Sequence, residues 1–115
     1  MAEETRPDPR QTNALPRPPG PLPEKPAIYT IHAASRSEER AWRDLTTSHG
    51  GKLRYFYDYL SQTPLKRDGE RVFPMKGKLL AGTWECEVGG GPRLQYVVDE
   101  AIKRVIVRAV FTSHP

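Results

Sequence analysis

The spacing of apolar residues changes abruptly just past the middle of the chain, and this change constrains the fold more than any other feature. Before it, apolar residues recur at the i, i+3, i+4, i+7 spacing of one helix face: Leu53, Phe56, Tyr57 and Leu60. After the charged loop 66–71, apolar and polar residues alternate, which is the spacing of half-buried strands. The chain is therefore predicted to carry helices followed by a sheet, an α+β arrangement.

Two helices are expected before this change. Ser35 and Glu38 match a capping box, in which each side chain satisfies an unpaired backbone donor at a helix start, and a helix is predicted over residues 36–47. The His-Gly-Gly sequence at 49–51 predicts its end, because glycine accepts the left-handed backbone that terminates helices. A second helix carries the apolar face described above and ends before Pro64, so the two helices are predicted to form a hairpin.

Strands are expected on both sides of the helices. Residues 27–33 alternate β-branched and aromatic side chains and predict a first strand. Four more strands are predicted after the charged loop: Val72–Lys78, Trp84–Val88, Arg93–Asp99 and Arg104–Phe111. The predicted order is β-α-α-β-β-β-β, an antiparallel sheet packed on a two-helix hairpin.

Residues 1–26 differ in composition from the rest of the chain. They hold eight of the twelve prolines and almost no large apolar side chains, which predicts a disordered Pro-rich tail. The run from Pro16 to Pro26 favours polyproline II geometry, either as a stiff leader without a partner or as a ligand for an aromatic groove. One domain is expected over residues 27–115, since a chain of 115 residues is too short for two sizeable cores.

The basic excess lies in the predicted domain. The chain has a formal charge of +4, and residues 1–26 contain four basic and four acidic side chains, so the whole excess belongs to residues 27–115. Positive charge is compatible with a nucleic-acid partner. A lone Cys86 and three scattered histidines predict no disulfide, metal or other cofactor. The absence of a secretory signal and of an apolar stretch of membrane-spanning length favours a cytoplasmic location.

Alternation gives each predicted strand an apolar face and a charged face. The helices are expected to cover the apolar face, which includes Trp84, Cys86, Val88, Leu94, Tyr96, Val98, Val105, Val107 and Ala109. The opposite face is expected to display Glu85, Glu87, Arg93, Gln95, Arg104 and Arg108. Such a charged open face is the candidate functional surface.

Residues 84–110 combine Trp-Glu-Cys-Glu-Val, a Gly-Gly-Gly turn, Arg-Leu-Gln-Tyr-Val-Val-Asp and a final apolar strand. In this order they resemble the C-terminal half of RelE/ParE superfamily toxins, in which an Arg-Leu-x-Tyr strand precedes a turn and a final apolar strand. With the preceding strand and helix pair, the resemblance covers residues 27–115. It implies a RelE-like fold, a toxin of a type II toxin–antitoxin system, and a cognate antitoxin protein as partner.

The resemblance also implies a reaction. The RelE and YoeB branches cut mRNA in the ribosomal A site without a metal, through attack of a ribose 2′-hydroxyl. That chemistry needs a base, cations that stabilise the phosphorane-like state, and an acid for the leaving 5′-oxygen. The expected function is therefore an endoribonuclease of the mRNA interferase class, with mRNA and the ribosome as partners.

Three residues are the catalytic candidates that the resemblance implies. Arg93 matches the family's phosphate-binding arginine, and its planar fork suits a pair of phosphate oxygens. His114 resembles the histidine near the YoeB C-terminus and is a candidate general acid or base. Glu85, or alternatively Glu70, stands in for the glutamate base of that branch. RelE carries lysines where this chain has Glu85 and Glu87, so an all-basic RelE centre is not present in full. YoeB-like chains have a tyrosine after the histidine where this chain has Pro115, which cannot donate a proton, so the identity of the general acid is left open.

Four more residues are candidates for binding the RNA backbone: Arg71, Lys76, Lys78 and Arg108. Each candidate also has an ordinary structural interpretation. Arg93 can pair with the glutamates across the sheet, and the two lysines can be solvated charges on an edge strand. Five aromatic side chains are able to stack on bases, although their spacing makes most of them core residues: Trp42, Tyr55, Phe56, Tyr57 and Trp84.

Two other function classes stay open. One is a toxin without nuclease activity that binds a protein target, as the ParE branch inhibits gyrase. The other is a binding or regulatory module in which the charged face contacts an acidic partner.

Overall fold

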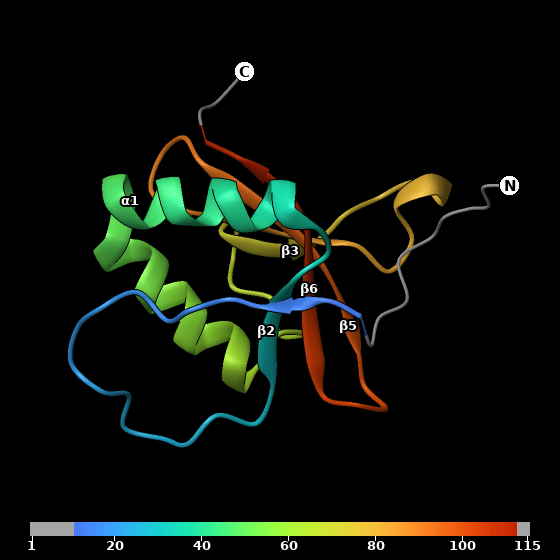
Figure 1. Cartoon of the computed structure of the whole chain (residues 1–115). Coiled ribbons are helices and arrows are strands. Elements are labelled where there is room, and N and C mark those ends of the chain that lie inside the picture. Colours follow the sequence, from blue (N-terminus) through green and yellow to red (C-terminus); the bar gives the residue numbers. More distant parts are fainter. Residues whose placement is uncertain (1–10, 113–115) are drawn as a thin grey trace, which may run out of the picture.

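The computed structural model describes residues 11–112 as one sheet with a long bent helix on one side (Figure 1). The strands are β1 (Asn13–Ala14), β2 (Thr30–Ala33), β3 (Val72–Pro74), β4 (Trp84–Glu87), β5 (Arg93–Asp99) and β6 (Arg104–Phe111). The helices are α1 (Arg36–Gln62) and a short 3-10 helix, η1 (Lys78–Leu80). The mixed α+β class predicted from the sequence is thus observed.

The sheet has the order β1-β2-β6-β5-β4-β3. The pairs from β6 through β5 and β4 to β3 are antiparallel, but β2 and β6 run parallel, with Ile31 opposite Val105. The prediction of a wholly antiparallel sheet is therefore wrong at this pair. A parallel pair needs a long connection, and α1 with three intervening strands provides one between β2 and β6.

Helix α1 supplies one side of the core. Its buried apolar residues pack with the inward side chains of β2 to β6: Trp42, Leu45, Leu53, Phe56 and Leu60. Ser35 caps its start, as predicted, by accepting from the backbone N–H of Ser37, and the Ser35 hydroxyl donates to the carboxylate of Glu38. No helix in the described part of the chain is long and apolar enough to cross a membrane.

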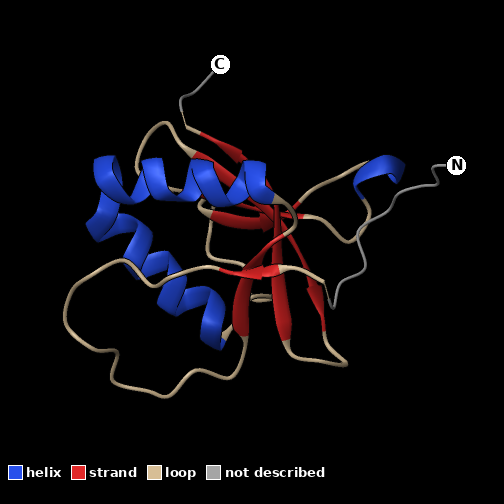
Figure 2. Cartoon of the chain, in the orientation of Figure 1, coloured by secondary structure: helices blue, strands red, loops and turns tan. Residues whose placement is uncertain are grey.

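The predicted two-helix hairpin is not confirmed. The helix continues from Arg36 to Gln62 and bends at His49, whose φ of −136° and ψ of 39° are not helical (Figure 2). Gly50 and Gly51 lie within the helix after this bend, not in the left-handed backbone that the sequence predicted. One non-helical residue is enough to redirect the axis, so the two arms of α1 cover the sheet without a connecting loop.

Strand β3 is shorter than predicted. It ends at Pro74, which has no backbone N–H to donate to a neighbouring strand. The chain then forms a loop closed by the bond from the Met75 N–H to the Thr83 carbonyl oxygen, at 2.8 Å, and η1 lies inside this loop. Lys76 and Lys78 therefore lie on a projecting loop and not on an edge strand.

The prediction of a disordered tail is not confirmed for residues 11–26, which we call the strap. Its first part forms β1, which extends the sheet beyond β2, and the Leu15 N–H donates to the Ile31 carbonyl oxygen at 2.9 Å. Leu15 is 4% exposed and belongs to the core. Residues 1–10 lie outside the described residues.

The rest of the strap passes along the second arm of α1 (Figure 1). Arg17 donates to both carboxylate oxygens of Asp58, each at 2.9 Å. The Trp42 indole N–H donates to the Pro16 carbonyl oxygen at 3.0 Å, and Arg54 donates to that of Pro19 at 2.8 Å. A proline-rich segment offers carbonyl oxygens but few N–H donors, so donors from the helix side chains hold it in place.

Candidate functional site

Charged side chains from β4 and β5 meet on the sheet face opposite α1. The antiparallel register places Glu85 opposite Gln95 and Glu87 opposite Arg93, and these four residues form what we call the Arg93 cluster. Arg93 Nη1 lies 3.1 Å from Glu85 Oε2, and Arg93 Nη2 lies 3.4 Å from Glu87 Oε2. Gln95 Nε2 donates to Glu85 Oε1 at 3.2 Å. The predicted salt bridges of Arg93 with both glutamates are therefore present.

Glu85 is the most buried member of this cluster. Its side chain is 5% exposed, while that of Arg93 is 29% exposed. A buried carboxylate is stable only when it is paired or hydrogen-bonded. Both Glu85 oxygens meet this condition, since one accepts from Arg93 and the other from Gln95.

A surface hollow of about 300 Å³ opens over the cluster. Its lining residues are Arg67, Glu70, Phe73, Glu85, Glu87 and Arg93. Two arginines face three glutamates, so the hollow is not basic by itself. It brings together Arg93 with Glu85 and Glu70, the two alternative bases suggested by the sequence.

Arg71 borders a different hollow. It is exposed, and its Nη2 donates to Asp68 Oδ2 at 3.0 Å. This second hollow, of about 480 Å³, lies between the second arm of α1 and the β4–β5 turn, and its lining residues are Gly51, Lys52, Tyr55, Phe56, Arg71, Glu87, Gly89 and Gly90. We call it the glycine-rimmed hollow. Glu87 borders both hollows, so the two adjoin at this side chain.

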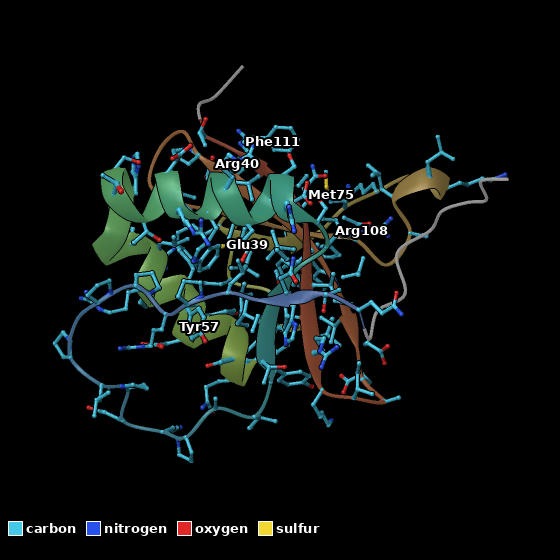
Figure 3. The ribbon with its side chains drawn as sticks, in the orientation of Figure 1. Glu39, Arg40, Tyr57, Met75, Arg108 and Phe111 are labelled. Carbon is cyan, nitrogen blue, oxygen red and sulfur yellow. The ribbon has the colours of Figure 1, made fainter. Side chains whose placement is uncertain are left out.

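The remaining RNA-binding candidates are dispersed. Lys76 and Lys78 are exposed on the β3–β4 loop. Arg108 is exposed on β6. Figure 3 shows it well apart from Tyr57, which lies on the second arm of α1. None of these three side chains lines either hollow. His114 lies outside the described residues.

The outward alternation of β6 is interrupted by a bulge. Tyr96 pairs with Val107 but Gln95 pairs with Ala109, so Arg108 is the extra residue on β6. Beyond this point Val110 packs against the core, and the prediction that Ala109 lies on the core face is wrong. Phe111 pairs with Arg93 and shares the open face. The regular alternation that the sequence predicts for β6, which would place His114 on the face of Arg93 if it continued to the end of the chain, therefore does not hold within this strand.

Three side chains of the two hollows were not singled out as functional by the sequence: Lys52, Arg67 and Phe73. Lys52 comes from the turn of α1 just after the bend, Arg67 lies within the charged loop 66–71, and Phe73 lies on β3. Strand β3 pairs with β4 and places Phe73 opposite Glu85. This pairing brings Phe73, and the preceding loop with Arg67, to the Arg93 cluster. The charged loop at 66–71 was the one available signal for Arg67.

The chain is similar in fold to a solved structure, although its sequence matches no family model. No protein-family model matches the chain, and no curated protein sequence matches it. Among solved structures, a chain of the toxin–antitoxin complex RelBE2 from Mycobacterium tuberculosis superimposes with a TM-score of 0.57. The two chains are 24% identical, and the match covers 76% of this chain and 93% of the other. The chain has a RelE-type fold. The resemblance seen in the sequence is thus confirmed at the level of the fold.

Within this RelE-type fold, the tyrosine of the Arg-Leu-x-Tyr motif has a structural role. Tyr96 is fully buried and its hydroxyl donates to the Pro64 carbonyl oxygen at 2.7 Å, which ties the segment after α1 to the sheet. Burial raises the pKa of the Tyr96 hydroxyl far above its usual range. Burial likewise raises the pKa of the Cys86 thiol. Both groups are protonated at neutral pH and lie in the core, so neither belongs to the charged open face.

Proposed function

We propose that this chain is the toxin of a type II toxin–antitoxin pair and that it cleaves mRNA at the Arg93 cluster, in association with the ribosome. The RelE-type fold, shared with a chain of a toxin–antitoxin complex, supports a toxin with an antitoxin partner. The single observation that carries the nuclease proposal is the contact of Arg93 with the buried Glu85 beneath an open hollow.

The chemistry assigns roles to Glu85, Arg93 and Gln95 of the cluster, and to His114. Glu85 accepts the proton of the ribose 2′-hydroxyl, which then attacks the neighbouring phosphorus while the 5′-oxygen leaves. Arg93 carries a fork of donors that can leave the glutamates for the phosphate oxygens as charge develops on them. Gln95 holds the other oxygen of Glu85 and so fixes the direction of the carboxylate. His114 is the proposed proton donor to the 5′-oxygen.

The test is induced expression in a bacterial host, with growth and mRNA cleavage by primer extension as readouts. We expect growth arrest with cuts within codons, and loss of both with Arg93→Lys, which keeps the charge but not the fork. Arg43→Ala is the matched control, since that arginine is on the exposed side of α1 and 3.7 Å from Glu39. Circular dichroism checks that each variant is folded.

Two results would contradict the proposal. One is cleavage that persists unchanged in both Arg93→Lys and Glu85→Gln. The other is growth arrest without any RNA cleavage, which would support the second candidate function.

That second candidate is a toxin of the same fold that binds a protein target and cuts no RNA. The observation that favours it is the closed pairing of the cluster, in which Arg93 contacts both glutamates and Gln95 contacts Glu85. Such a network is also a stable way to carry charge on an open sheet face. DNA supercoiling measured with the purified protein separates this candidate from the nuclease.

A further inference from the structure

The glycine-rimmed hollow combines an open backbone with two cations and an aromatic ring. Its rim is formed by Gly51 on α1 and by Gly89 and Gly90 in the β4–β5 turn. A Cβ added at Gly51 or Gly90 would meet no atom within 4 Å, so the backbone is open to a ligand there. The volume of about 480 Å³ is within the range of small-ligand sites.

The cations of this hollow are held at its edge. A Cβ at Gly89 would lie 2.7 Å from Lys52 Cδ, so the absence of a side chain at Gly89 lets the Lys52 stem lie over the turn. Arg71, on the other side, is 58% exposed and donates to Asp68 through Nη2. A guanidinium has five N–H donors, and an exposed pair of this kind is weak enough to be exchanged for a phosphate.

An aromatic ring completes the lining. Tyr55 is half exposed, at 50%, whereas the adjacent Phe56 is 3% exposed and belongs to the core. The two rings meet edge to face, with centroids 4.9 Å apart and an interplanar angle of 83°. Phe56 therefore supports the Tyr55 ring at the surface, where a base can stack on it.

Charge distinguishes the two hollows. The hollow over the Arg93 cluster has two arginines and three glutamates, whereas the glycine-rimmed hollow has Lys52 and Arg71 with Glu87 alone. A nucleic-acid strand obtains most of its binding free energy from cations at its phosphates, which the cluster does not supply in excess. Because Glu87 borders both hollows, a strand that crosses the cluster can continue into the more basic one.

We propose that the glycine-rimmed hollow binds a nucleotide of single-stranded RNA next to the one at Arg93, with its phosphate on Lys52 and Arg71 and its base on Tyr55. This inference rests on the proposed function and names a substrate contact of the same surface. Of the four backbone-binding candidates expected from the sequence, the site contains Arg71 alone, and of the aromatic side chains able to stack on bases it contains Tyr55 and Phe56.

The test is binding of a fluorescein-labelled 2′-O-methyl oligouridine of seven nucleotides to the full chain, followed by anisotropy. The 2′-O-methyl group removes the attacking hydroxyl, so binding is measured without cleavage. We expect Tyr55→Ala to weaken binding about tenfold and Tyr55→Phe to weaken it less than about twofold, because stacking needs the ring and not the hydroxyl. Lys52→Ala should also lower the salt slope of log Kd by about 0.7, the value for one phosphate of a single strand.

Lys25→Ala is the matched control, because that lysine is exposed on the strap and lines neither hollow. It should bind the oligonucleotide as the unmodified chain does. Equal losses for the Lys25 and Lys52 variants would overturn the proposal in favour of unspecific charge attraction. So would failure of the unmodified chain to bind, or unchanged binding by Tyr55→Ala and Lys52→Ala. If Tyr55→Ala and Lys52→Ala still bind the oligonucleotide but lose binding to a protein partner, the hollow is a site for that protein and the proposal is wrong.

The two proposals can fail separately. If Tyr55→Ala weakens oligonucleotide binding while the unmodified chain cleaves no RNA, the nuclease proposal fails and the nucleotide site stands. If cleavage depends on Arg93 while the Tyr55 and Lys52 variants bind and cleave normally, the nuclease stands and this site is wrong.

Discussion

Replacing Leu15 by alanine tests whether the strap is part of the folded domain. Leu15 is 4% exposed and contacts the core, while Leu22, in the same proline-rich segment, is 87% exposed. Full burial of a leucine side chain is worth about 1.5–3 kcal/mol, and truncation to alanine in a core costs about 2–5 kcal/mol. Because Leu15 is at the edge of the core, where the strap can relax, we expect about 2 kcal/mol for Leu15→Ala. Leu22→Ala should change stability by less than about 0.5 kcal/mol.

The measurement is urea unfolding of the full chain, followed by tryptophan fluorescence. Trp42 reports on the strap directly, since its indole N–H donates to the Pro16 carbonyl oxygen. A loss of about 2 kcal/mol corresponds to a fall in the midpoint of about 1 M urea for a slope near ~2 kcal/mol/M. Leu15→Ala should show this fall at an unchanged slope.

A disordered tail would give a different result. In that case neither leucine is buried, and both variants should unfold at the same urea concentration as the unmodified chain. A midpoint for Leu15→Ala that coincides with that of Leu22→Ala would therefore refute the packing of the strap. It would also support a folded domain that begins at residue 27, as the composition of the chain predicts.

Three further predictions concern Gly89, His32 and Cys86, of which His32 pairs with Ala14 of the strap. Gly89→Ala should destabilise the chain by about 1 kcal/mol or more, because φ at Gly89 is +60° and Lys52 occupies the space of the new methyl group. Gly90→Ala, at φ +81°, meets no neighbouring atom and should cost less. Thermal unfolding of the two variants measures the difference. Burial and the charge of Arg104 lower the pKa of His32 below its usual value near 6.5. The stability that neutral His32 contributes is then complete above about pH 6.5 and declines as the pH falls from there through the folded-state pKa, which NMR titration of the ring protons measures. Cys86 should resist alkylation by iodoacetamide in the native chain and react after unfolding, because burial raises the pKa of its thiol; rapid native labelling would show an accessible thiolate.

The regular strands were predictable because their side chains alternate. The predicted bounds of β5 and β6 are those of the structure, and the antiparallel register follows from the short turns between β4, β5 and β6. Once that register is fixed, Glu87 must lie opposite Arg93, so the core of the candidate site could be inferred from the sequence. The contacts of Glu85 with Gln95 and of Arg93 with both glutamates follow from the same pairing.

Other elements were not predictable from local pattern. Strand β1 has two residues, too few for a period, and its pairing with β2 depends on Leu15 reaching a core that other segments build. The helix bend depends on one residue, His49. The two glycines that follow it predicted the end of the helix at this point. The parallel pairing of β2 with β6 joins the two ends of the domain, and no short-range signal encodes such a contact.

The bulge in β6 shows how one residue alters the site. Without it, regular alternation would put Arg108 and residue 112 on the face of Arg93. With Arg108 as the extra residue, Ala109 and Phe111 take that face, and Phe111 becomes the cross-strand neighbour of Arg93. Phe111 is 43% exposed, so the bulge places a partly exposed apolar side chain opposite Arg93 in the sheet. An apolar neighbour strengthens the attraction of Arg93 for a charged group, whether that group is a glutamate or a phosphate. The β-bulge therefore decides which side chains of β6 share the face of Arg93.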